Sequence, residues 1–139
     1  MWRIQMPLPS SSFDTAKRHC QQIDPTGSIP LIGEVSTLRV IVDLCIVPLG
    51  TEPSLSPCVA ACERVLAEAG LKIALHANGT NIEGEWDDVF AAIKRCHETV
   101  HAMGAPRIYS TIKVNTRTDK EQTLEDKIAS VEAVLNPGQ

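Results

Sequence analysis

The chain has 139 residues, of which 43% are hydrophobic and 22% are charged, the balance of one ordinary soluble domain. Thirteen Lys and Arg residues against seventeen Asp and Glu residues give a formal charge of -4, which disfavours a broad electrostatic contact with nucleic acid. Aromatic residues make up only 4% of the chain, too few for a base-stacking platform. The longest apolar stretch, Leu38–Leu49, contains Arg39, Asp43 and Pro48 and is too short for a membrane span. We therefore expect a soluble protein that binds neither nucleic acid nor membrane.

The cysteines indicate a reducing compartment. They are odd in number and form no CxxC pair, which fits neither a disulfide framework nor a zinc ribbon. The five are Cys20, Cys45, Cys58, Cys62 and Cys96. Free thiols that serve as small core residues are the ordinary case in intracellular proteins. We expect a cytoplasmic protein with no metal site and no cofactor.

Residues 1–37 differ from the rest of the chain. They contain four prolines and a run of serines, Ser10–Ser12, and their apolar residues show neither helical nor strand spacing. The sequence therefore predicts a disordered N-terminal extension at 1–37, a domain at 38–135 and a short tail at 136–139. Basic residues and serines in the extension leave mitochondrial targeting as an alternative, although its arginine content is low for a transit peptide.

The domain begins with a strand and a helix. From Val40 to Ile46 every second residue is apolar, which is the two-residue period of a strand with one fully apolar face. Ser56-Pro57 is a helix start signal, and apolar residues then recur at helical spacing until Gly70.

A hairpin and a second helix follow. Leu71–His76 alternates as a strand, Asn78-Gly79 is typical of a type I′ turn, and Thr80–Glu83 can return as a third strand. From Trp86 to Gly104 an apolar stripe and an acidic first turn predict a helix.

The last part of the domain predicts a strand and a helix. Residues 107–115 alternate as a fourth strand, and apolar residues at helical spacing mark a helix over Leu124–Leu135, capped by Thr123. The complete order is β-α-β-β-α-β-α. It predicts an α+β fold, a ferredoxin-like β-α-β-β-α-β two-layer sandwich with an extra C-terminal helix.

Such a sandwich leaves one sheet face free of helices. The alternation places these residues on that face: Arg39, Ile41, Asp43, Cys45, Lys72, His76, Tyr109, Thr111 and Lys113. The set is too polar for core and too apolar for a plain solvent surface, so we expect an interface between subunits that contains a polar pocket.

Asp43 stands in the middle of an apolar strand and needs a partner if it is covered. Two interpretations remain open. In the first, Asp43 forms a structural ion pair with Arg39 or Lys113. In the second, it binds a cationic or amino-bearing ligand. His76 and Tyr109 are likewise compatible with structural roles as well as with ligand contacts.

The sequence His97-Glu98-Thr99-Val100-His101 matches HExxH, the zinc motif of metalloproteases. On a helix, however, His97 falls within the apolar stripe and Glu98 points toward solvent, so no open catalytic cleft is implied. No third-ligand helix follows. We interpret the match as coincidental and expect no catalytic residues and no metal ligands.

Several strings together resemble the YkoF-like thiamine-binding family. They are Pro48-Leu49-Gly50-Thr51, the run from His76 to Trp86 (HANGTNIEGEW), Cys96-His97-Glu98, and Thr111-Ile112-Lys113-Val114 with Arg117. The resemblance covers residues 38 to 135. It implies a ferredoxin-like subunit that pairs through its sheets into homodimers or homotetramers and binds thiamine or a related hydroxymethylpyrimidine.

Thiamine joins a thiazolium cation to an aminopyrimidine, so its site needs a carboxylate, hydroxyl partners and a surface for stacking. The predicted ligand-binding residues are Asp43, Thr51, His76, Thr80, Glu83, Tyr109, Thr111 and Lys113. Two alternatives remain: a structural or regulatory oligomer whose open face serves only for assembly, and a small enzyme acting on such a ligand. The enzyme ranks last because no nucleophile and base stand at convincing spacing.

Overall fold

The fold is a ferredoxin-like α+β sandwich with one further helix, as the periodicity predicts. The structure is a computed structural model that describes residues 37–50 and 54–137. The predicted extension at 1–37 therefore lies almost wholly outside the described residues. The elements, in chain order, are β1 (Arg39–Leu49), α2 (Ser56–Glu68), β2 (Lys72–His76), β3 (Gly79–Glu85), α3 (Trp86–Ala102), β4 (Arg107–Thr116) and α4 (Leu124–Leu135).

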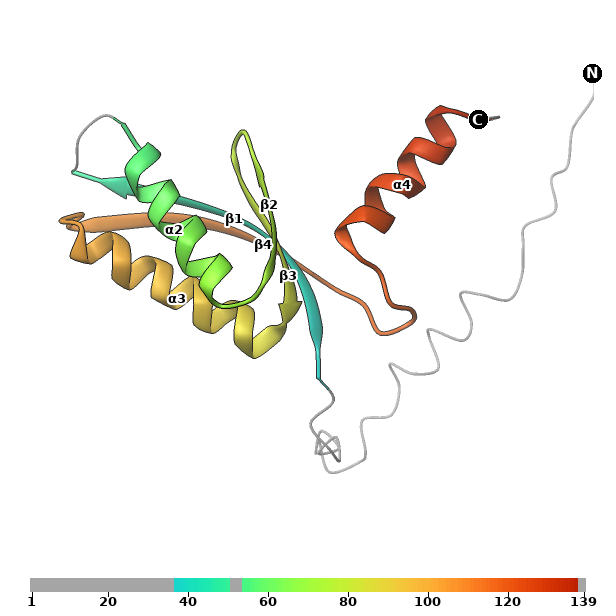
Figure 1. Ribbon diagram of the computed structural model, residues 1–139, viewed down its shortest axis with the longest axis horizontal. Coiled ribbons are helices and arrows are strands. Elements are labelled where there is room, and N and C mark those ends of the chain that lie inside the picture. The colour runs from blue at the N-terminus through green and yellow to red at the C-terminus, as the bar shows by residue number, and fades with distance from the viewer. Residues whose placement is uncertain (1–36, 51–53, 138–139) are drawn as a thin grey trace, which may run out of the picture. The chain divides into compact units, whose positions relative to one another are not determined.

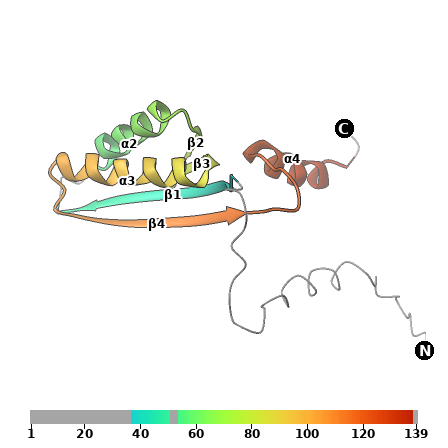
Figure 2. The same ribbon diagram turned by 90° about the horizontal axis from the view of Figure 1, so that it is seen from below.

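The four strands form one antiparallel sheet in the order β2-β3-β1-β4, with β3 and β1 as its two inner strands and the longest pairing between β1 and β4. Helices α2 and α3 lie together on one face of this sheet (Figures 1 and 2). Neither helix covers the opposite face, which is the open face that the alternation in β1 and β4 predicts. None of the helices in the described ranges is both long and apolar enough to cross a bilayer.

The core lies between the sheet and these two helices. Alternate residues of β1, from Val40 to Leu44, are buried and meet Ile82 of β3, which is fully buried. Leu66 of α2 and Val89 of α3 close the core from the helical side. Burying each such aliphatic side chain contributes about 1.5–3 kcal/mol. Because the chain has few aromatic residues, small branched side chains and thiols fill most of this space.

The turn of the hairpin differs from the prediction. The two residues of the turn are Ala77 and Asn78, and Gly79 is already the first residue of β3, paired with His76. Gly79 does not adopt a positive φ, so a type I′ turn is not the reason for this glycine. A Cβ at residue 79 would lie 2.6 Å from the carbonyl oxygen of Leu44. Glycine is required here because β3 passes very close to β1.

Helix α4 is where the sequence predicts it, but its apolar side is not buried by the described residues. Its first turn has a capping box in which Thr123 accepts from the Asp126 amide and Asp126 accepts from the Thr123 amide. The apolar residues Ile128, Val131 and Leu135 are 57–71% exposed. An exposed stripe of this kind is typical of a surface that another molecule covers.

Candidate ligand-binding site

The open face of the sheet carries a cluster of three charged or polar side chains, Asp43 and its two partners. The β1 and β4 strands pair so that Asp43 stands opposite Lys113. Lys113 Nζ donates to Asp43 Oδ2 at 2.9 Å, and His76 Nε2 lies 2.9 Å from Asp43 Oδ1. The backbone amide of Asn78 donates to His76 Nδ1, so Nε2 carries the proton and donates to Asp43. The geometry therefore pairs Asp43 with Lys113 and His76, not with Arg39.

This arrangement favours the charged forms of the pair. The hydrogen bond from Lys113 holds the pKa of the Asp43 carboxyl below its ordinary value, and burial offsets part of that effect. The same bond raises the pKa of the Lys113 ammonium. Asp43 is thus an ionised acceptor whose two oxygens both already have protein partners. A ligand on this face would have to compete with them.

Acid titration tests this cluster. Because the pKa of Asp43 is lower in the folded protein, its stabilising contribution is complete above the unfolded value of about 3.9 and is lost as the pH falls through the folded pKa. We expect the side-chain carboxyl resonance of Asp43 to titrate below the ordinary pKa of an aspartate by NMR. In Lys113→Met the same resonance should move back toward the ordinary value. An unchanged midpoint in that variant would contradict the assigned ion pair.

The other predicted site residues are distributed over both faces. Tyr109 and Thr111 lie on the open face with Asp43 and are exposed. Thr80 is buried on the opposite face, toward the helices. Thr51 lies outside the described residues. The predicted set therefore does not form one continuous site.

Glu83 lies on the open face but is 5% exposed and fully engaged by the protein. Its Oε1 accepts from Arg39 at 3.0 Å, and its Oε2 lies 3.4 Å from Lys72 and accepts from the Leu124 amide at 3.0 Å. Two cations and the first turn of α4 thus surround this carboxylate. These contacts give Glu83 a structural role in attaching the start of α4 to the sheet.

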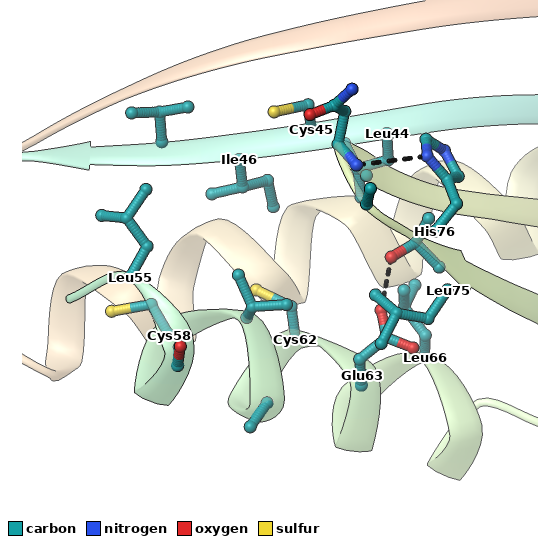
Figure 3. A pocket seen from close by; sticks show the side chains of 18 residues that line it. Leu44, Cys45, Ile46, Leu55, Cys58, Cys62, Glu63, Leu66, Leu75 and His76 are labelled. Carbon is teal, nitrogen blue, oxygen red and sulfur yellow. Dashed lines mark hydrogen bonds between the residues drawn. The ribbon is translucent and has the colours of Figure 1, made fainter.

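A pocket of about 820 Å³ lies on the other side of the sheet, between α2, the second half of β1 and the β2–β3 hairpin (Figure 3). This is a typical size for a small-molecule site. Its lining is largely apolar and includes Leu44, Ile46, Leu55, Val59, Leu66 and Leu75. Three thiols, those of Cys45, Cys58 and Cys62, belong to residues of the same lining.

One end of this pocket is polar. Glu63 of α2 and Thr80 of β3 line it, and the Thr80 hydroxyl donates to Glu63 Oε1 (Figure 3). His76, from the end of β2, also lines the pocket, so the pocket and the Asp43 cluster lie on two sides of one hairpin. The arrangement offers a flat apolar ligand a slot that ends in a carboxylate and a hydroxyl.

Sequence reasoning missed Glu63, although a signal was present. Glu63 is four residues after Val59 and three before Leu66, so it belongs to the helix face that packs on the sheet. An acid within an apolar helical stripe is a candidate functional group. The contact with Thr80 was not visible, because it joins two elements that only the tertiary fold brings together.

The two histidines of the HExxH match bind neighbouring protein groups. His97 Nε2 is hydrogen-bonded to Ser110 Oγ at 2.9 Å, and His101 Nδ1 donates to the carbonyl oxygen of Ala105 at 2.8 Å. Within residues 37–50 and 54–137, no group of three or more His, Cys, Asp or Glu side chains is placed to hold a metal ion. Glu98 is exposed and lies within 3.5 Å of Lys94.

The four-stranded antiparallel sheet, the two helices on one face and the apolar pocket beneath α2 define a small ferredoxin-like protein with room for a small organic ligand. Residues 42–132 match the sequence family described as "Thiamine-binding protein". This match covers more than half of the chain, and the chain therefore belongs to that family.

Relatives support the same assignment. A UPF0045 protein of Synechocystis sp. is 61% identical over 101 residues, which are 73% of this chain and 84% of the relative. The UPF0045 protein ECM15 of Eremothecium gossypii is 45% identical over 103 residues, 73% of this chain and 98% of the relative. The crystal structure of a hypothetical protein from Methanocaldococcus jannaschii is similar with a TM-score of 0.63 at 34% identity, covering 68% of this chain and 96% of that one.

Proposed function

We propose that this protein binds thiamine or a related hydroxymethylpyrimidine compound as a homo-oligomer, without transforming it. The observation that carries the proposal is the apolar pocket of about 820 Å³ in a chain of the thiamine-binding protein family. A pocket of this size has room for a two-ring ligand, and Glu63, the one carboxylate among the described residues of its lining, suits a ligand with amino groups and a positive charge. The net charge of -4 also favours the approach of a cation.

The described residues favour binding over catalysis. Ser110 and His97 form a hydroxyl–imidazole pair, but no carboxylate in the described ranges is hydrogen-bonded to His97, and neither residue lines the pocket. Catalytic serines require a base that a third group orients. Binding alone is therefore the function that the geometry supports best.

Titration calorimetry of the folded wild-type protein tests this function. We expect saturable heat with thiamine and with 4-amino-5-hydroxymethyl-2-methylpyrimidine, at about one ligand per chain. Incubation of the same mixture followed by chromatography should return the ligand chemically unchanged. Absence of heat with both compounds would contradict the proposed function, and conversion of the ligand would contradict its non-catalytic character.

The open face supports the oligomer. Its centre combines half-buried apolar residues of β1, Ile41 and Val47, with Tyr109 of β4, which is 63% exposed. A partner chain that covers this face would bury Tyr109, and large aromatic side chains are common anchors of interfaces. A structural or regulatory oligomer, which uses this face only for assembly, is the second candidate that the same observation favours.

Substitution of Tyr109 tests the assembly surface. Tyr109→Glu places a charge on the apolar part of the open face, and we expect the mass by light scattering to fall toward that of one chain. Ala91→Glu, at an exposed position of α3, is the matched control and should keep the wild-type mass. Equal masses for Tyr109→Glu and wild type would show that the oligomer forms through another surface.

Substitution of Asp43 separates the two candidate functions. If the protein is a ligand-binding oligomer with its site in the pocket, Asp43→Asn should retain the affinity for thiamine, because both Asp43 oxygens already have protein partners. Loss of affinity in Asp43→Asn, with the oligomer intact, would place the ligand on the open face. An assembly that forms normally and binds no thiamine-related compound would support the structural or regulatory candidate.

A further inference from the structure

Cys62 and Cys96 form a pair of buried thiols between the two helices that cover the sheet. Cys62 of α2 is 6% exposed, and Cys96 of α3 is fully buried. The Cys96 thiol donates to the backbone carbonyl oxygen of Cys62 at 3.7 Å, and the two thiol groups also interact directly. Both cysteines are reduced in the structure. This contact meets the first requirement for a disulfide, which cannot form between cysteines that lie far apart.

The pocket gives one of these two thiols an access path. Cys62 belongs to the lining, whereas Cys96 does not (Figure 3). A pocket of about 820 Å³ admits molecules of the size of water or hydrogen peroxide with room to spare. A small oxidant that enters it therefore reaches Cys62 first.

The interaction between the thiols makes Cys62 the more reactive of the two. The hydrogen bond with Cys96 holds the pKa of the Cys62 thiol below its ordinary value, although burial and the charge of Glu63 oppose this effect. The same hydrogen bond, together with burial, raises the pKa of the Cys96 thiol. The thiolate is the nucleophilic form of cysteine, so Cys62 is suited to react first and Cys96 to resolve the product.

We propose that Cys62 and Cys96 are a peroxide-sensitive dithiol that oxidises to a disulfide between α2 and α3. In the first step the Cys62 thiolate attacks hydrogen peroxide. An S–O bond forms, the O–O bond breaks, and the hydroxide that leaves takes up the proton that Cys62 lost, so that Cys62 becomes a sulfenic acid and water is released.

In the second step the Cys96 sulfur attacks the Cys62 sulfur. The S–S bond forms, the S–O bond breaks, and hydroxide leaves with the proton of the Cys96 thiol as water. Overall the two thiols lose two electrons and two protons, and one molecule of peroxide is reduced to two molecules of water.

The disulfide would act on the wall of the pocket. It joins α2, which forms that wall, to α3, and it closes a loop of chain that contains β2 and β3. Such a cross-link stabilises a protein mainly by restricting the unfolded chain. We therefore expect the oxidised protein to unfold at a higher denaturant concentration than the reduced protein, whatever ligand the pocket binds.

Peptide mapping without reductant tests the disulfide on the wild-type, full-length protein. The reduced protein is treated with a small molar excess of hydrogen peroxide under native conditions, alkylated and digested with trypsin. Trypsin leaves Cys62 in residues 40–64 and Cys96 in residues 96–107. We expect these two peptides to be found linked, lighter by two hydrogen atoms than their sum, and dithiothreitol should separate them.

Variants identify which thiol of the first peptide is linked. Cys58→Ser is the matched control, because Cys58 lines the same pocket one turn earlier on the same helix. It should keep the linked pair of peptides, and Cys62→Ser should lose it. When Cys96→Ser is added to Cys58→Ser, oxidation should stop at the Cys62 sulfenic acid, which dimedone captures on residues 40–64.

Three results would each overturn the proposal. The first is an oxidised wild-type protein whose two peptides remain separate. The second is a link to Cys96 that persists in Cys62→Ser, which would assign the disulfide to another thiol. The third is a linked protein whose unfolding midpoint equals or falls below that of the reduced protein, since the disulfide would then be incompatible with the native packing of α2 on α3.

Discussion

Gly79→Ala is expected to destabilise the protein by about 3 kcal/mol, the upper end of the usual cost of overpacking. The added Cβ would lie 2.6 Å from the Leu44 carbonyl oxygen and 3.0 Å from Asp43 Oδ1. A backbone oxygen cannot rotate away, so the hairpin would have to move off β1. That movement would also break the hydrogen bond between His76, at the end of β2, and Asp43 of β1.

Denaturant unfolding followed by circular dichroism, at one fixed protein concentration because the protein is proposed to be oligomeric, measures this loss. Gly70→Ala is the matched control. Gly70 has a φ of +71° but nothing within 4 Å of the added Cβ, so it reports backbone strain alone, at about 1–2 kcal/mol. If Gly79→Ala costs no more than Gly70→Ala, the close approach of β3 to β1 is wrong.

Glu83→Ala is expected to lower the free energy of unfolding by about 2–3 kcal/mol, the range for lost hydrogen bonds to a charged group. The variant removes the acceptor of Arg39, of Lys72 and of the Leu124 amide. The two cations are half exposed and can return to water, so the cost stays below that of a fully buried unpaired charge. The buried amide of Leu124 has no such compensation.

Hydrogen exchange locates this effect. The Leu124 amide should exchange much faster in Glu83→Ala, while amides in the middle of α3 keep their protection. Glu121→Ala, an exposed acid in the segment before α4, is the control and should change neither stability nor exchange. Slow exchange at Leu124 in Glu83→Ala would show that another group holds the start of α4.

Most of the fold could be predicted, because the spacing of the apolar residues and the Gly, Pro and capping residues at segment ends indicate the same elements along the domain. The alternation from Val40 to Ile46 identifies β1 and its buried face, and Thr123 marks the start of α4. The hairpin turn was predicted one residue too late. The Asn78-Gly79 pair matches a common turn signal, but the glycine serves a contact with β1 that no local pattern reveals.

The candidate site was predictable only where it follows from strand geometry. Alternation correctly places Asp43 and Lys113 on one face, and antiparallel pairing then brings them together. The burial and structural role of Glu83 could not be predicted, because the groups that contact it come from β1, β2 and α4. Nor was the pocket, because the Glu63–Thr80 contact depends on how α2 packs over the hairpin.

The exposed stripe of α4 shows a further limit of sequence patterns. Residues that face a core and residues that face another molecule have the same helical spacing. Ile128, Val131 and Leu135 therefore predict an amphipathic helix correctly without indicating what covers it.

A crystal structure of the protein grown with saturating thiamine gives the most direct answer. We predict electron density for the ligand in the apolar pocket between α2 and the β2–β3 hairpin. Density beside Asp43 and Tyr109 on the open face would contradict the assigned site. If the pocket is empty in every chain of such a crystal, thiamine binding by this protein is contradicted.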